Sequence, residues 1–173
     1  ALPFPETGLM VRPLYDEPFV VALPAGHAWE SRKKIDAGDL KQETMLLLGT
    51  GHCFRDHVLG VCPELMRFSQ TADGIQKTFE GSSLETIRHM VASGVGITVL
   101  PRMSVQEVRA HAGGPDAGLL SYVPFDEPVP DRRVVLAWRK SFTRMPAIDA
   151  ISEAIAACDL PGVSKLDMPA VLN

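Results

Sequence analysis

Cys53 is the residue of this sequence whose surroundings point most clearly to chemistry. It follows the turn-forming run Gly49-Thr50-Gly51, with His52 beside it and Arg55 two residues further on. A thiol attacks an oxidant as its thiolate, and a helix N-terminus or a nearby cation lowers the pKa of a cysteine. If the glycine-rich turn opens a helix, Cys53 has a helix N-terminus as well as nearby side chains that can carry positive charge. The alternative is an inert, buried Cys53, because free cysteine is among the most buried residue types.

A second cysteine, Cys62, is a candidate bonding partner for Cys53. Nine residues of helix rise about 13.5 Å, whereas a disulfide needs Cα atoms roughly 4.4–6.8 Å apart. If residues 53 to 62 are mostly helical, the bond therefore requires local refolding. Closing a loop of about ten residues corresponds to roughly 2.7 kcal/mol in the chain-entropy model. A free energy of this size is large enough to matter for a conformational switch, although completely reversing the populations of two conformations needs about 5.5 kcal/mol.

The elements that must position these cysteines alternate between strands and helices. Four strands are predicted: Leu9 to Leu23 (in one piece or broken near residues 16–18), Met45 to Leu48, Ile97 to Leu100 and Arg133 to Trp138. Four helical segments are predicted: a short turn at Asp39-Leu40, residues 52 to Pro63, a helix from Ser82 to Gly94, and one marked by Ile148, Ile151 and Ile155. This alternation predicts an α/β fold.

Local patterns predict how two of these helices begin and pack. Ser82 with Glu85 forms a capping-box pattern. The residues that follow form one apolar face, made of Leu84, Ile87, Met90 and Val91. Cys158 continues the apolar stripe of the last helix and is expected in the core. The tail from Leu160 is expected to be loosely held.

The composition limits the class of protein. The chain has 173 residues, 46% of them apolar and 22% charged, with a net charge of -4. A duplex-binding module usually carries a basic face, so direct DNA contact is not expected of this chain. No apolar run approaches the roughly 20 residues needed to cross a bilayer, and the first residues lack a signal-peptide pattern. We therefore expect a cytoplasmic protein, where a disulfide is more often functional than structural.

Other candidate sites have simpler interpretations. His52, Cys53, His57 and Cys62 resemble a mixed metal set, but their spacing fits no standard zinc pattern, so no metal is expected. His57 alone is more typical of a surface histidine.

The serine and glycine motifs also have simple structural interpretations. Ser82 and Ser83 stand at a helix start, where ligands often bind, although capping alone explains Ser82. Gly49-x-Gly51 and Gly94-x-Gly96 lack the third glycine and the lysine of phosphate-binding loops. We interpret both as turns, and we expect no cofactor.

Three segments resemble one known family. They are Gly51 to Asp56 (Gly-His-Cys-Phe-Arg-Asp) with Gly60 and Cys62, the run Ser83 to Pro101, and Pro13 to Pro18. Together they are similar to the OxyR regulators, the hydrogen-peroxide-sensing group of LysR-type transcription regulators, over residues 1 to 158. The cysteine segment is highly specific, whereas Gly-Val-Gly-Ile-Thr is shared by LysR-type effector domains more widely. The resemblance implies a two-lobed, periplasmic-binding-protein-like α/β fold.

The resemblance also implies roles for individual residues. Cys53 would be the peroxidatic cysteine, oxidised by hydrogen peroxide to a sulfenic acid, and Cys62 the resolving cysteine of a reversible disulfide. The peroxide pocket and the support of the thiolate would come from Thr50, Gly51, His52 and Arg132, with Arg133 as the alternative register for the arginine.

An organisation in lobes follows from the same resemblance. Residues 1–15 and 121–160 would form part of the first lobe, 16–120 the second lobe with the cysteines, and 161–173 a tail; Gly113-Gly114-Pro115 and the prolines after it mark the connection. The family's helix-turn-helix, linker helix and first part of the regulatory domain do not match this sequence, so the first lobe is expected to be incomplete. The full-length partners would be promoter DNA, further copies as dimers and tetramers, and a thiol reductant such as glutaredoxin.

Two other functions stay open at this point. A thiol peroxidase shares the chemistry, but it must turn over with a reductant, and the sequence has no Cys-x-x-Cys or docking signature. A LysR-type effector domain would bind a small organic acid between its lobes, with the cysteines incidental. We expect a stoichiometric sensor rather than an enzyme, in which oxidation changes the conformation of the oligomer and its DNA binding.

Overall fold

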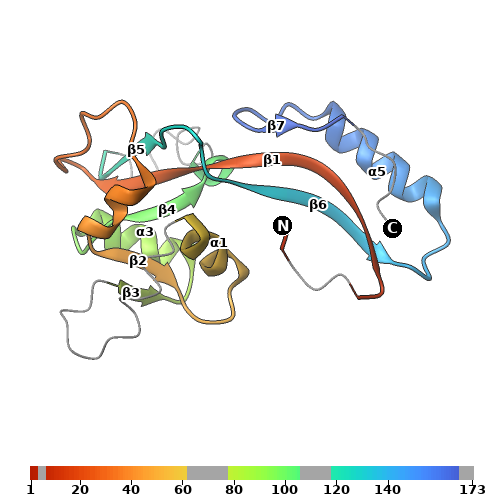
Figure 1. Cartoon of the computed structure of the whole chain (residues 1–173), viewed down its shortest axis with the longest axis horizontal. Coiled ribbons are helices and arrows are strands. Elements are labelled where there is room, and N and C mark those ends of the chain that lie inside the picture. Colours follow the sequence, from red (N-terminus) through yellow and green to blue (C-terminus); the bar gives the residue numbers. More distant parts are fainter. Residues whose placement is uncertain (4–6, 62–77, 106–117, 168–173) are drawn as a thin grey trace. The chain divides into compact units, whose positions relative to one another are not determined.

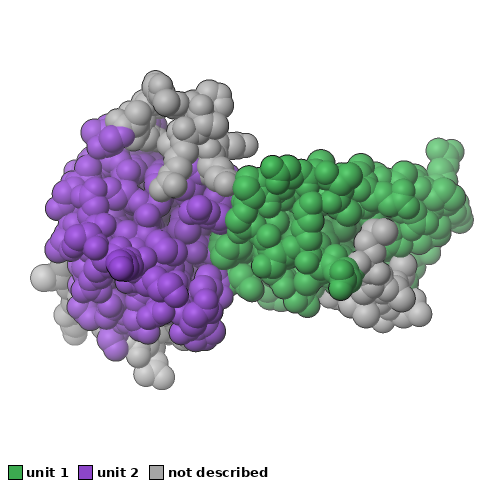
Figure 2. All heavy atoms as spheres, turned by 90° about the horizontal axis from the view of Figure 1, so that it is seen from above, with its two compact units in different colours: residues 1–18, 131–173 green, residues 19–130 purple. Residues whose placement is uncertain are grey.

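The chain divides into two compact units. The computed structural model describes residues 1–3, 7–61, 78–105 and 118–167. Unit 1 consists of Ala1–Pro18 and Asp131–Asn173, and unit 2 of Phe19–Pro130 (Figure 2). The expected lobe boundaries were residues 15 and 120. The chain returns to unit 1 at Asp131, later than the expected residue 121, because strand β5 (Leu120–Pro124) pairs with the part of β1 that belongs to unit 2. The predicted connection at Gly113-Gly114-Pro115 lies outside the described residues.

Strand β1 (Leu9–Pro24) is one continuous strand of 16 residues. Of the two alternatives, the unbroken strand is confirmed and the break near residues 16–18 is wrong, because β6 (Asp131–Arg139) runs antiparallel to β1 through this stretch (Figure 1). Asp16 lies opposite Arg133, and Glu17 lies opposite Arg132. Cross-strand pairs of opposite charge favour a sheet, so the polar run that suggested a break supports the strand instead. The register shifts earlier, between Pro13 and Tyr15.

The strands of unit 2 pair in two groups. The end of β1 pairs antiparallel with β4 (Thr98–Pro101) on one side and with β5 on the other. β2 (Met45–Leu48) runs parallel to β3 (Thr78–Gly81). The sequence predicted β2 and β4 correctly but missed β3 and β5. Both are short, and β3 carries Glu80 and Gly81, residue types that are depleted in strands.

The helices of unit 2 were predicted well, apart from one cap. The 3-10 helix η1 (Ala37–Gln42), α1 (Cys53–Val61) and α3 (Leu84–Ala92) occur where the patterns indicated. Ser83, rather than Ser82, caps α3, and its Oγ accepts from the N–H of Thr86 at 3.1 Å. Glu85 therefore makes no capping box; it accepts from Arg88 at 2.7 Å.

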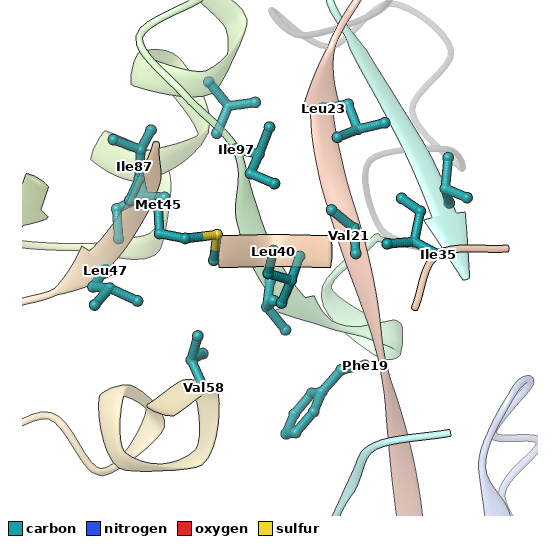
Figure 3. Packing of buried hydrophobic residues seen from close by; sticks show 14 of the residues in the cluster. Phe19, Val21, Leu23, Ile35, Leu40, Met45, Leu47, Val58, Ile87 and Ile97 are labelled. Carbon is teal, nitrogen blue, oxygen red and sulfur yellow. The ribbon is translucent and has the colours of Figure 1, made fainter. Parts of the chain in front are cut away.

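The core of unit 2 centres on β2, whose four side chains are all buried. Val58 of α1 and Ile87 of α3 belong to the same apolar cluster as Met45 and Leu47 (Figure 3). Val91 is also buried, and Leu84 and Met90 pack against this cluster, which confirms the predicted face of α3. The N–H of Leu46 donates to Ile97 at 2.8 Å, which ties β2 to the start of β4.

In unit 1, helix α5 (Met145–Ala157) is tied to β1 by a buried arginine. Arg12 donates to Ser152 Oγ at 3.0 Å and to Asp149 Oδ1 at 2.8 Å. Ile148 is buried, as the predicted stripe required, but Ile151 is 46% exposed. No helix among the described residues combines the length and apolar character needed to cross a membrane.

The end of the chain corrects two expectations. Cys158 is exposed rather than in the core, because α5 ends at Ala157 and the extended backbone of Cys158 leaves the helical stripe. The tail is also better held than expected as far as Leu166. β7 (Ser164–Lys165) pairs with Tyr15 and Asp16, and the N–H of Leu166 donates to Leu14 at 3.0 Å.

Gly96 gives a first test of the fold, because it sits where the chain approaches Thr44 closely. A Cβ at Gly96 would collide with the carbonyl oxygen of Thr44 and lie 3.1 Å from its Cγ2. We expect Gly96→Ala to lower the free energy of unfolding by about 1–3 kcal/mol, measured by urea denaturation. Gly60→Ala is the matched control, since among the described residues no atom outside its own helix backbone and chain neighbours lies within 4 Å of its Cβ. Equal stability of both variants would contradict the packing described here.

The Asp16–Arg133 pair gives a second test, through pH. Arg133 donates to both carboxylate oxygens of Asp16 at 2.8 Å, and this hydrogen bonding lowers the pKa of Asp16 below its ordinary value of 3.8. The pair therefore stabilises the fold above the unfolded-state pKa, and this stability is lost as pH falls through the lower folded-state pKa.

We expect Asp16→Asn to unfold at lower urea concentration than the wild type at neutral pH. The difference should shrink in acid as Asp16 of the wild type is protonated. Asp126→Asn is the control, because its pair with Lys34 is looser, at 3.5 Å, and exposed. A difference that stays constant down to acidic pH would argue against the ion pair as its source.

Candidate redox site

A tight turn carries the chain from β2 into α1. The N–H of Gly49 donates to Gly81 at 3.1 Å, which extends the pairing of β2 with β3, and the N–H of His52 donates back to Gly49 at 3.3 Å. Gly51 has φ 95°, a left-handed conformation that glycine adopts without strain. The helix then begins at Cys53. The predicted glycine-rich turn and helix start are thus confirmed.

Cys53 is exposed, and its thiol is free. The alternative of a buried Cys53 is therefore wrong, while its reactivity stays a prediction. The other predicted pocket residues on this segment, Thr50, Gly51 and His52, are exposed as well, so the four form one continuous accessible stretch. A helix N-terminus carries partial positive charge from its N–H groups. An anion formed on Cys53 would thus lie where the backbone favours negative charge.

The opposite face of α1 is buried and aromatic. Phe54, Val58 and Leu59 are buried, and the ring of Phe54 meets that of Phe19 edge-on, with centroids 5.7 Å apart. His57 is half-buried beside these rings, 6.3 Å from Phe54 and 6.4 Å from Phe19. It is therefore not the surface histidine that the sequence suggested. This face holds α1 in place while Cys53 stays accessible.

Arg55 links the first turn of α1 to both strands beneath it. Its Nη1 donates to the carbonyl oxygen of Leu48 at 2.9 Å and to Oε1 of Glu80 at 2.6 Å. Its side chain is only 14% exposed, while that of Glu80 is 48% exposed. Sequence reasoning identified Arg55 as a nearby cation but missed Glu80. The two residues are far apart in the chain, and β3 was not predicted, so no local pattern could have paired them.

Cys62 and Pro63 lie outside the described residues. The helix is described as far as Val61, which confirms helical structure for most of the stretch between the cysteines. From Cys53 to Val61 a helix rises about 12 Å. Within the described ranges, no three His, Cys, Asp or Glu side chains come together in a way that could hold a metal ion.

Arg132 belongs to unit 1, whereas Cys53 belongs to unit 2. Nε and Nη2 of Arg132 lie 2.9 and 2.8 Å from Oε2 of the buried Glu17. Arg133, the alternative register, is held by Asp16 in the same unit. The role of Arg132 at the thiolate stays a prediction. Glu17 was not predicted as its partner, although the opposed charges of 16–17 and 132–133 were a usable signal.

A small pocket lies within unit 1, between β1, α5 and β7. Its lining is mostly apolar, with Pro13, Leu14 and Ile155 among the residues that form it. No residue of the cysteine segment lines it. It therefore plays no part in the thiol site.

Comparisons with known proteins agree with this geometry. The LysR substrate binding domain model matches residues 1–158. The hydrogen peroxide-inducible genes activator of Pectobacterium carotovorum subsp. carotovorum is 39% identical over 127 residues, or 73% of this chain and 38% of that protein. The chain thus spans well under half the length of that relative.

Two solved structures match in fold as well as sequence. The reduced OxyR regulatory domain from Pseudomonas aeruginosa is 47% identical, with a TM-score of 0.71, over 91% of this chain and 70% of that one. A reduced form of OxyR from N. meningitidis is 44% identical, with a TM-score of 0.79, over 95% of this chain and 73% of that one. These matches confirm the α/β, periplasmic-binding-protein-like fold class. The chain belongs to the LysR substrate-binding domain family and, within it, to the OxyR regulatory domains.

Proposed function

We propose that this chain is the peroxide-sensing part of an OxyR-type transcription regulator, with Cys53 as the peroxidatic cysteine. The observation that carries the proposal is the free, exposed thiol of Cys53 at the first residue of α1. Thr50, Gly51 and His52 adjoin it on the accessible turn and would border the peroxide. Membership of the OxyR group supports the same substrate, since the Pectobacterium relative is a hydrogen peroxide-inducible activator.

The chemistry consumes one peroxide and two thiols. The thiolate of Cys53 attacks one peroxide oxygen, the O–O bond breaks, and the other oxygen leaves with a proton as water. Cys53 is then a sulfenic acid. The thiolate of Cys62 attacks this sulfur, an S–S bond forms as the S–O bond breaks, and the sulfenic oxygen leaves as hydroxide, which takes up a proton to give a second water. Peroxide is the oxidant throughout, and a thiol reductant such as glutaredoxin would later restore both thiols.

Disulfide formation would have to unwind part of α1. The helix spans Cys53–Val61, so its ends lie about 12 Å apart, whereas bonded cysteines need Cα atoms within roughly 6.8 Å of each other. Oxidation therefore becomes a change of backbone conformation rather than a local bond. This is how a small oxidant would alter a protein surface.

In the full-length regulator, this change would alter the contacts between copies and the binding of attached domains to promoter DNA. Dimers and tetramers, a cytoplasmic location and activation of transcription are part of this proposal. Unit 2 would be the lobe that carries the cysteines, and unit 1 would be part of the other lobe. Arg132 would support the thiolate of Cys53 in the assembled regulator.

Thiol mapping tests the proposal directly. After brief exposure to a small excess of hydrogen peroxide, we expect Cys53 and Cys62 to resist alkylation and to appear in mass spectra as one cross-linked peptide. Cys158 should remain alkylatable. Cys53→Ser should abolish the response, whereas Cys158→Ser, the matched control at the other exposed free thiol, should preserve it. Finding both sulfurs of the wild type still free would refute the sensor.

Peroxide consumption separates a sensor from an enzyme. A thiol peroxidase in the presence of a thiol reductant would consume peroxide continuously. We expect this protein to consume about one equivalent per chain before its thiols are spent, and then only as fast as the reductant resets it. The measurement is peroxide remaining over time, with Cys53→Ser as the blank. Sustained rapid turnover would show a peroxidase instead.

A further inference from the structure

The contact between Arg55 and Glu80 joins the start of α1 to β3. One nitrogen, Nη1 of Arg55, serves both Leu48 O and Glu80 Oε1. Leu48 is the last residue of β2, and Glu80 is paired opposite Leu47 across the two strands. The arginine therefore holds the first turn of α1 on the end of the β2–β3 sheet, two residues beyond Cys53.

The same pair brackets the segment that would refold. Arg55 lies between Cys53 and Cys62, and Glu80 follows in β3, so everything from residue 56 to 79 lies between the two partners. A bond between the cysteines closes a loop that contains Arg55. That loop cannot remain helical over its whole length, because a helix would hold residues 53 and 62 about 13.5 Å apart. Among the described residues, Arg55 thus forms a charged anchor of the first turn within the region that must change.

We infer that Glu80 is a positioning residue for the redox switch: its carboxylate holds Arg55, and through it the first turn of α1, in the helical, reduced form. This inference rests on the proposed function. The contact stabilises the dithiol relative to the disulfide, and a stabilised reduced form makes a disulfide a stronger oxidant. Glu80 would therefore set how readily the sensor oxidises, without touching peroxide or either sulfur.

The expected size follows from the exposure of the pair. Arg55 is mostly buried, but Glu80 is about half exposed, so solvent screens the interaction. Pairs of this kind change an equilibrium by a few fold, here about threefold. Because Glu80→Gln keeps the shape of the side chain and the Arg55–Leu48 hydrogen bond, it removes the charge alone.

The test is a redox titration of the protein in glutathione buffers, with the fraction of Cys53–Cys62 disulfide read by alkylation and mass spectrometry. In this equilibrium the protein disulfide and two glutathiones exchange with the dithiol and glutathione disulfide. At low salt we expect Glu80→Gln to shift the equilibrium about threefold toward the protein disulfide. The shift should largely disappear at high salt, where the ion pair of the wild type is screened.

Asp39→Asn is the matched control, because it breaks another ion pair of unit 2 outside the redox segment: Arg32–Asp39, at 2.7 Å against 2.6 Å for Arg55–Glu80. It should leave the redox equilibrium unchanged. The wild type gives a reading that needs no substitution, since raising the salt alone should increase its oxidised fraction. Equal titrations of wild type and Glu80→Gln, with no effect of salt, would overturn the inference while leaving the sensor intact. A wild type that forms no Cys53–Cys62 disulfide would overturn both.

Discussion

Burial of the four side chains of β2 is the interaction on which the thiol site depends. Met45 to Leu48 are all buried, and the elements around the site pack or pair against them. β3 lies parallel to β2. Helices α1 and α3 contribute Val58 and Ile87 to the same apolar cluster, and the backbone of Ile97 is hydrogen-bonded to that of Leu46. The turn after Leu48 can therefore project its residues outward from a fixed base. Cys53 stays accessible on this turn while Phe54, Val58 and Leu59 hold the other face of α1 against the core.

A short helix on this base is well suited to a switch. α1 has nine residues, fewer than the roughly 12–15 that an isolated helix needs to be even marginally stable in water. Its stability comes from tertiary contacts: the buried face around Phe54 and Val58, and the arginine at its first turn. Gly60 in the last turn weakens the helix by about 1 kcal/mol relative to alanine.

Local patterns in the sequence predicted most of the elements and the heart of the site. The periodic spacing and the runs of apolar residues identified β2, β4, α1 and α3. The glycine-rich turn before Cys53 identified the start of α1. What local patterns missed was set by partners distant in the chain. The charged run at Asp16 and Glu17 suggested a break until Arg132 and Arg133 were known to lie opposite. Cys158 seemed to continue a stripe, but the helix ends one residue earlier.

Glu80 shows the same limit at the site itself. Neither its residue type nor its neighbours in the sequence identify Glu80 as a site residue, because its proposed role depends on a contact with Arg55, which is distant in the chain. The energies involved explain why such a residue matters. Loop closure at about 2.7 kcal/mol falls short of the roughly 5.5 kcal/mol that reverses a population. The remainder must come from several small differences between the two forms, so each contact present in only one of them shifts the threshold. In the proposed switch, the exposed thiol of Cys53 makes oxidation accessible, and the weak contacts that hold α1 on its sheet would decide how far the backbone rearranges once the disulfide forms.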